Sequence, residues 1–153
     1  MKIDFAFLAD AAQASPDGKF SVIGGGLTAI YAQKFPTLLQ ALALVVKLIA
    51  TKDEVGLEHN LRIELINPLQ VTAMPPLGGK FTIAPNLEHP DWPITAQFVI
   101  TIAPIVFEIP GSYTLRFSVD SILLKTLTLY AVTQPAPTFP LATQVNPLTQ
   151  EDV

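Results

Sequence analysis

The densest group of residues able to do chemistry is the run Glu88, His89, Pro90, Asp91 and Trp92. Two carboxylates and an imidazole are ligands for a divalent metal, or an acid and a base beside an aromatic ring. Three neighbours on a proline-bounded loop seldom converge on one point, and no second histidine follows at a metal-ligand spacing. We therefore expect a solvated loop in which Trp92 anchors the core or an interface.

Other candidate sites have simpler structural interpretations. Asp10 and Asp17 flank a predicted turn and would share a calcium ion only if that turn brought them together, but no EF-hand spacing is present. The three glycines at positions 24–26 would hold a phosphate only before a helix, and residues 27–31 predict a strand. In strand-like surroundings these glycines indicate a bulge or a close approach of another backbone.

The residues do not favour an enzyme. The chain has no cysteine, only two histidines and no Gly-x-Ser-x-Gly motif. Four aromatic residues would form a sugar-stacking platform if they were exposed together: Tyr31, Trp92, Tyr113 and Tyr130. Carbohydrate or small-ligand binding is therefore the alternative function, and neither a cofactor nor a metal is expected.

Charge is scarce along the whole chain. Half of the 153 residues are hydrophobic and only 14% are charged, against about a quarter in average soluble domains. A net charge of -4 without a basic cluster argues against nucleic-acid binding. A surface with so little charge is expected to expose apolar patches, which usually mark partner sites.

No targeting or membrane segment is apparent. Asp4 and Asp10 interrupt the apolar run that a secretory signal needs. No stretch reaches the ~18 apolar residues of a membrane span. The expectation is a cytoplasmic protein, or one carried in an assembled particle.

The first predicted element is a β-hairpin. Residues 3–7 and 20–23 partly alternate between apolar and polar, and Ser15-Pro16-Asp17-Gly18 is a strong turn signal between them. Leu38 to Thr51 has the composition of either a helix or a buried strand. We predict a central strand from about Ala41 to Ala50, with a short helical turn as an option before it.

The later chain predicts a β-sandwich. Residues 59–66, 92–103 and 112–119 alternate, a short strand is expected near 80–83, and Asp120-Ser121 turns the chain into residues 122–132. Tyr113, two residues after Gly111, suits a corner tyrosine that bonds back to its loop. The predicted fold is all-β: a single immunoglobulin-like sandwich of about eight strands over residues 1–132.

Residues 133–153 predict a different, extended tail. Four prolines prevent regular pairing, yet Phe139, Leu141 and Val145 are apolar. We expect these three to anchor the tail on its own or a neighbouring subunit, and Val99 and Thr101 to belong to an outward face of low charge. The expected function is a non-enzymatic structural or interaction module that self-assembles or docks onto a protein partner, with a virion or filament component as one version.

Three motifs carry a resemblance: Ala9-Asp10-Ala11-Ala12-Gln13, then SPDGK at 15–19, then the glycines at 24–26. The chain resembles a family of small uncharacterised bacterial proteins that open with this pattern. Pro110-Gly111-x-Tyr113 and the hairpin at Asp120 resemble the later part of that family, although Ser121 stands where glycine is typical. The resemblance covers residues 1 to about 132, implies one β-sandwich-like domain, and carries no assigned activity.

Overall fold

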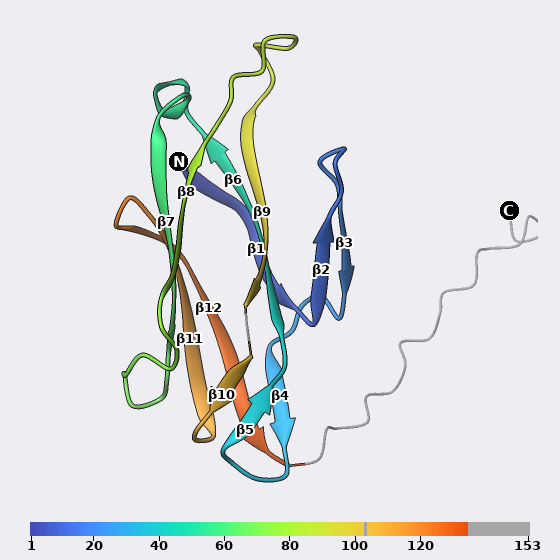
Figure 1. The fold of residues 1–153 in the computed structure, drawn as a ribbon, viewed down its shortest axis with the longest axis vertical. Coiled ribbons are helices and arrows are strands. Elements are labelled where there is room, and N and C mark those ends of the chain that lie inside the picture. The colour runs from blue at the N-terminus through green and yellow to red at the C-terminus, as the bar shows by residue number, and fades with distance from the viewer. Residues whose placement is uncertain (103, 135–153) are drawn as a thin grey trace, which may run out of the picture.

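The structure is a computed structural model that describes residues 1–102 and 104–134 (Figure 1). This part of the chain forms twelve strands and one 3₁₀ turn, η1 (Lys52–Glu54). The predicted tail anchors Phe139, Leu141 and Val145 lie outside the described residues. The strands are β1 (Lys2–Ala9), β2 (Ala11–Ala14), β3 (Phe20–Ile23), β4 (Ala29–Ala32), β5 (Thr37–Leu39), β6 (Leu42–Ala50), β7 (Glu58–Ile66), β8 (Leu77–Thr82), β9 (Ile94–Ile102), β10 (Ile105–Phe107), β11 (Gly111–Val119) and β12 (Ile122–Thr133).

Two sheets form the body of the molecule, which confirms the predicted all-β sandwich. One is three-stranded, in the order β1-β6-β9, and the other is five-stranded, in the order β4-β12-β11-β7-β8. All neighbours are antiparallel except β4 and β12, which run parallel. The order of β12, β11, β7 and β8 corresponds to strands G, F, C and C′ of immunoglobulin-like folds. The predicted number of about eight strands fits these two sheets, while two further two-stranded ribbons, β2-β3 and β5-β10, were not predicted as such.

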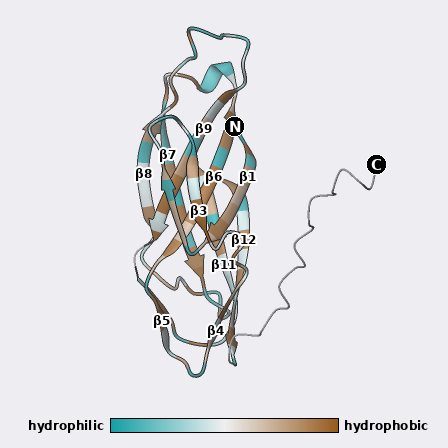
Figure 2. Cartoon of the chain, turned by 90° about the vertical axis from the view of Figure 1, so that its right-hand side faces the viewer, coloured by the Kyte–Doolittle hydropathy of each residue, from teal (hydrophilic) through white to brown (hydrophobic). Residues whose placement is uncertain are grey.

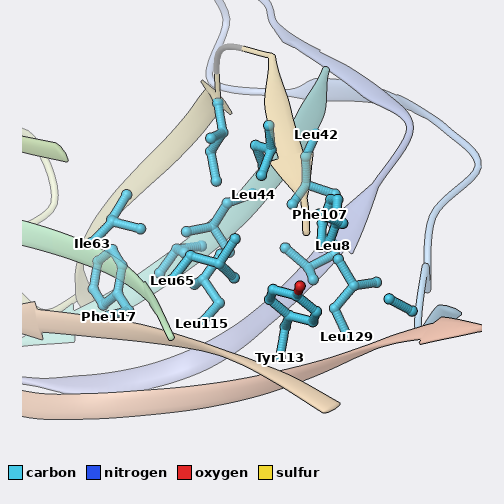
Figure 3. Packing of buried hydrophobic residues seen from close by; sticks show 14 of the residues in the cluster. Leu8, Leu42, Leu44, Ile63, Leu65, Phe107, Tyr113, Leu115, Phe117 and Leu129 are labelled. Atoms are coloured by element: carbon cyan, nitrogen blue, oxygen red, sulfur yellow. The ribbon is translucent and has the colours of Figure 1, made fainter. Parts of the chain in front are cut away.

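The core lies between the sheets and is almost entirely aliphatic and aromatic (Figure 3). Leu42, Leu44 and Leu48 of β6 are fully buried and belong to one cluster with residues of β7 and β11. Alternate residues of β11 point inward, including Leu115 and Phe117. Figure 2 shows hydrophobic residues along the strands of both sheets and hydrophilic residues in η1. The predicted central strand is confirmed as β6, with β5 where a helical turn was the option.

The first hairpin pairs differently from the prediction. The turn at Ser15 to Gly18 is present, with the Gly18 N–H donating to the Ser15 carbonyl at 3.0 Å and a φ of 80° at Gly18. However, β3 pairs with β2, whereas β1 pairs with β6 in the three-stranded sheet. Alternation shows that a segment is a strand but not which strand it pairs with. It therefore does not reveal that the extended chain breaks at Asp10, between β1 and β2.

Gly24 lies close to Asp10 at this break. Gly24 has a φ of 62°, and a Cβ atom there would lie 1.9 Å from the Asp10 carboxylate. The Asp10 N–H donates to the Gly24 carbonyl at 3.3 Å. The group that excludes a side chain at Gly24 is thus the Asp10 side chain rather than another backbone, and the glycines lie in a loop rather than inside a strand.

The corner before β11 forms as the sequence predicts. The Tyr113 hydroxyl donates to the Ile109 carbonyl at 2.9 Å, and the side chain is 1% exposed. Its ring packs edge-on against Phe107. The following hairpin turns through Asp120 and Ser121, which have φ values of 50° and 66°, so the turn is of the I′ kind without a glycine.

Replacing Tyr113 by phenylalanine tests the corner. Tyr113→Phe removes the hydroxyl and leaves the Ile109 carbonyl without its partner, so we expect the free energy of unfolding to fall by about 1 kcal/mol. Urea denaturation measures this. Tyr130→Phe is the matched control, since Tyr130 is 52% exposed, and equal losses in both variants would contradict a special role for the corner.

Candidate functional site

The loop between β8 and β9 carries the residues first singled out for chemistry, and it lies at one end of the sandwich (Figure 1). The His89 ring stacks on Trp92, with centroids 4.0 Å apart and planes 12° apart. The Trp92 N–H donates to the His89 carbonyl at 3.1 Å. Glu88, His89 and Asp91 are exposed, and the described residues contain no cluster of three metal-binding side chains. Trp92 is 59% exposed, so the prediction that it anchors the core is wrong and the interface option is the one left.

A mainly apolar groove of about 280 Å³ lies beside Trp92. Lys52 and Val55, from η1 and the residue that follows it, form part of its wall. The remaining wall is formed by Pro85, Asn86, Leu87, Pro90, Trp92 and Ile94. Leu87 is 85% exposed, which leaves a large side chain in solvent next to an indole ring. Such a surface can bind an apolar or ring-shaped group, and it holds no acid–base pair for catalysis.

The structure does not assemble the other sites considered from the sequence. Asp10 lies at the base of the β2-β3 ribbon and Asp17 at its tip, where the Asp17 carboxylate pairs with Lys19 at 3.1 Å. The four aromatic residues do not form one sugar platform, because Tyr113 is buried and Tyr130 lies on β12. Tyr31 and Tyr130 lie on the neighbouring strands β4 and β12, and of the four residues Trp92 is the one that lines a groove at the loop end.

The face predicted at Val99 and Thr101 is partly covered. Val99 is half-buried beside Val45, which is fully buried, whereas Thr101 is exposed. The β2-β3 ribbon lies against this face: the Gln97 side chain donates to the Gly18 carbonyl at 3.2 Å. Much of the outer apolar surface of β6 and β9 is thus covered by the chain itself.

A charged cluster that the sequence did not predict surrounds His59. This side chain is 5% exposed and packs on Phe81. Its Nδ1 lies 2.7 Å from the Asp120 carboxylate, and its Nε2 lies 2.8 Å from the Glu54 carbonyl. Both partners are acceptors, so only the doubly protonated imidazolium donates to each of them.

The electrostatics follow from this geometry. The hydrogen bond to Asp120 is the main cause that raises the pKa of His59, with the Glu54 carbonyl second and burial opposing both. The same contact lowers the pKa of Asp120, which also accepts from the Asn60 N–H at 2.8 Å. The Met1 ammonium and then the Thr51 N–H lower the pKa of Glu54. With both ring nitrogens engaged, His59 has no free atom for a metal or substrate, so the cluster joins η1, β7 and the β11-β12 turn.

The pH dependence of stability tests this cluster. The contribution of His59 is fully present below about pH 6.5, its unfolded pKa, and is lost as pH rises through the raised folded pKa. The contributions of Asp120 and Glu54 are present above about pH 4 and are lost as pH falls. We therefore expect the free energy of unfolding, measured in urea, to decline from pH 6 to pH 9.

His59→Gln should flatten this decline. His89→Gln, on the exposed loop, is the matched control and should preserve it. A decline that persists in the His59 variant would show that the pH dependence has another source.

No helix among residues 1–102 and 104–134 has the length and apolar character to cross a membrane.

Comparisons with known proteins identify the family to which this chain belongs. A search of curated proteins finds no match. Residues 4–132 match the family of unknown function DUF6941, in agreement with the resemblance to an uncharacterised family. The chain therefore belongs to DUF6941, a family of unknown function.

Proposed function

We propose that the protein is a non-enzymatic interaction module that joins copies of itself, or docks onto a protein partner, through apolar surface that its few charges leave exposed. The observation that carries this proposal is the exposure of Leu87 and Trp92 beside the groove at the loop end. Tryptophan in a pocket-lined patch is a common centre of binding energy at interfaces. At the opposite end of β7, Leu69 and Val71 are also exposed.

The described charges support a preferred side for contact. Lys80 pairs with Glu58 at 2.6 Å and Arg62 with Glu64 at 2.9 Å, all on β7 and β8. These exposed pairs keep the outer surface of that part of the sheet hydrated and add little stability. Contacts through β12, where Lys125 is the single charged residue, displace fewer charges from water. The predicted outward face at Val99 and Thr101 belongs to the same proposal. So do the predicted tail anchors, Phe139, Leu141 and Val145.

Light scattering across concentrations tests self-association. The monomer mass is 16.5 kDa, and we expect a larger mass that changes little when salt rises, because apolar contacts are weakly screened. Leu87→Ser with Trp92→Ala removes two exposed apolar groups and should weaken association or partner binding at least about tenfold.

Leu69→Ser is the matched control, since Leu69 is 70% exposed on a distant loop. A monodisperse monomer at all concentrations, with no partner recovered by affinity purification, would overturn the proposal. Equal effects of both substitutions would remove the loop end from it.

The exposed indole also supports a second candidate, a carbohydrate or small-ligand site. Trp92 is the sole tryptophan, so its fluorescence reports directly on the groove. If a sugar stacks on the face that His89 leaves open, a ligand found on a glycan array should quench this emission, and His89→Ala should alter its affinity. If no glycan on the array binds the protein, this candidate is excluded.

A further inference from the structure

One edge of β12 is only partly paired. Along one side, residues 122–131 pair with β11, with a register shift at Leu124. On the other side, β4 pairs only with Tyr130 to Thr133. Residues 122–129 therefore have no hydrogen-bonded strand on that side within the described chain, although β1 lies near β12 across a groove.

The backbone groups on this edge are directed outward. The Tyr130 N–H donates to the Thr28 carbonyl, on the β4 side, at 2.9 Å. Because the direction of backbone groups alternates along a strand, Thr128 and Thr126 present their N–H and C=O groups to the same side. In the described residues these groups make no backbone hydrogen bond there.

A groove of about 320 Å³ runs beside this edge. Residues 6–8 of β1 form one wall, residues 125–128 of β12 form the other, and residues 26–28 complete it. Leu8 is buried and Ala6 is half-buried, and both pack with the core cluster. The groove therefore combines unpaired strand backbone with an apolar wall, which is what an added strand requires.

The chain itself contains a segment of matching chemistry. Residues 141–146, LATQVN, are free of proline between Pro140 and Pro147. Leu141, Thr143 and Val145 alternate with Ala142, Gln144 and Asn146, the period of a strand with one apolar face. No charge occurs from Thr126 to Gln150, so burying this segment carries no cost of removing an ion from water.

We propose that residues 141–146 of a second copy add as a strand to the open edge of β12, with Leu141 and Val145 in the groove beside Ala6 and Leu8. A second copy fits better than the same chain, because β4 occupies the edge between the groove and the end of β12. Pro135, Pro137 and Pro140 favour an extended connection over the sharp reversal that self-docking needs. This inference rests on the proposed self-association and names the segment and the surface that produce it.

Charge substitutions in the full-length protein test the donor segment. Leu141→Asp with Val145→Asp should raise the dissociation constant for self-association, measured by sedimentation, about 100-fold, because two apolar side chains leave the groove. Ala142→Asp with Gln144→Asp adds the same charge on the alternate face and should change it little. Equal effects of the two pairs, or no effect of either, overturn the proposed strand.

Crosslinking tests the acceptor edge, and the cysteine-free chain makes it unambiguous. Full-length protein with Thr143→Cys is mixed with protein carrying Thr126→Cys or Thr128→Cys. Adjacent strands meet the distance for a disulfide, so a mixed dimer is expected. Thr82→Cys, on β8 at the opposite edge of the same sheet, is the control and should form none.

The two proposals fail in different ways. A protein that associates, but is insensitive to the substitutions at 141 and 145 and forms no mixed disulfide, overturns this inference and leaves the proposed function intact. A further variant carries both cysteines, Thr143→Cys and Thr126→Cys, in one chain. If the protein stays monomeric and this variant forms its disulfide only within a single chain, the proposed strand addition between two copies is overturned.

Discussion

Burial of β6 on both faces is the constraint on which the rest of the structure depends. Leu42, Leu44 and Leu48 face the second sheet, while Val45 on the opposite face is equally buried. A strand that is apolar on both faces needs a layer on each side. The five-stranded sheet supplies one layer. The other comes from the β2-β3 ribbon, whose Phe20 packs against Phe7, the neighbour of Val45 in the sheet register.

This requirement explains why strand identities could be predicted from the sequence while their partners could not. The alternation of β7, β9 and β11 follows from having one face in the core, and it marks these strands without knowledge of the fold. The pairing of β1 with β6 joins residues more than thirty positions apart, and no local pattern encodes it. The ribbon of β5 and β10 escaped prediction because three residues per strand are too few to show a period.

The candidate sites follow the same division. Glu88, His89 and Asp91 drew attention because they are neighbours in sequence, yet their side chains remain in solvent. His59 and Asp120 are 61 residues apart, yet they form an ion pair in which the His59 ring is buried. A signal was present in retrospect, since His59 lies on the inward side of an alternating strand, and a ring buried there needs hydrogen-bond partners. Which acceptor would reach it depended on the β11-β12 turn, whose position only the whole sandwich determines.

Scarce charge and an open strand edge are two aspects of one problem in this fold. Sheet edges that would otherwise pair with other chains are commonly protected by lysine, by shortness or by a cover. Here β8 carries Lys80, β4 has only four residues, and the β2-β3 ribbon lies beside β9. The first half of β12 has Lys125 but also the exposed side chains of Ile122 and Leu123. The remaining edge strand, β1, and the unpaired first half of β12 border one groove, which is the surface proposed above for strand addition.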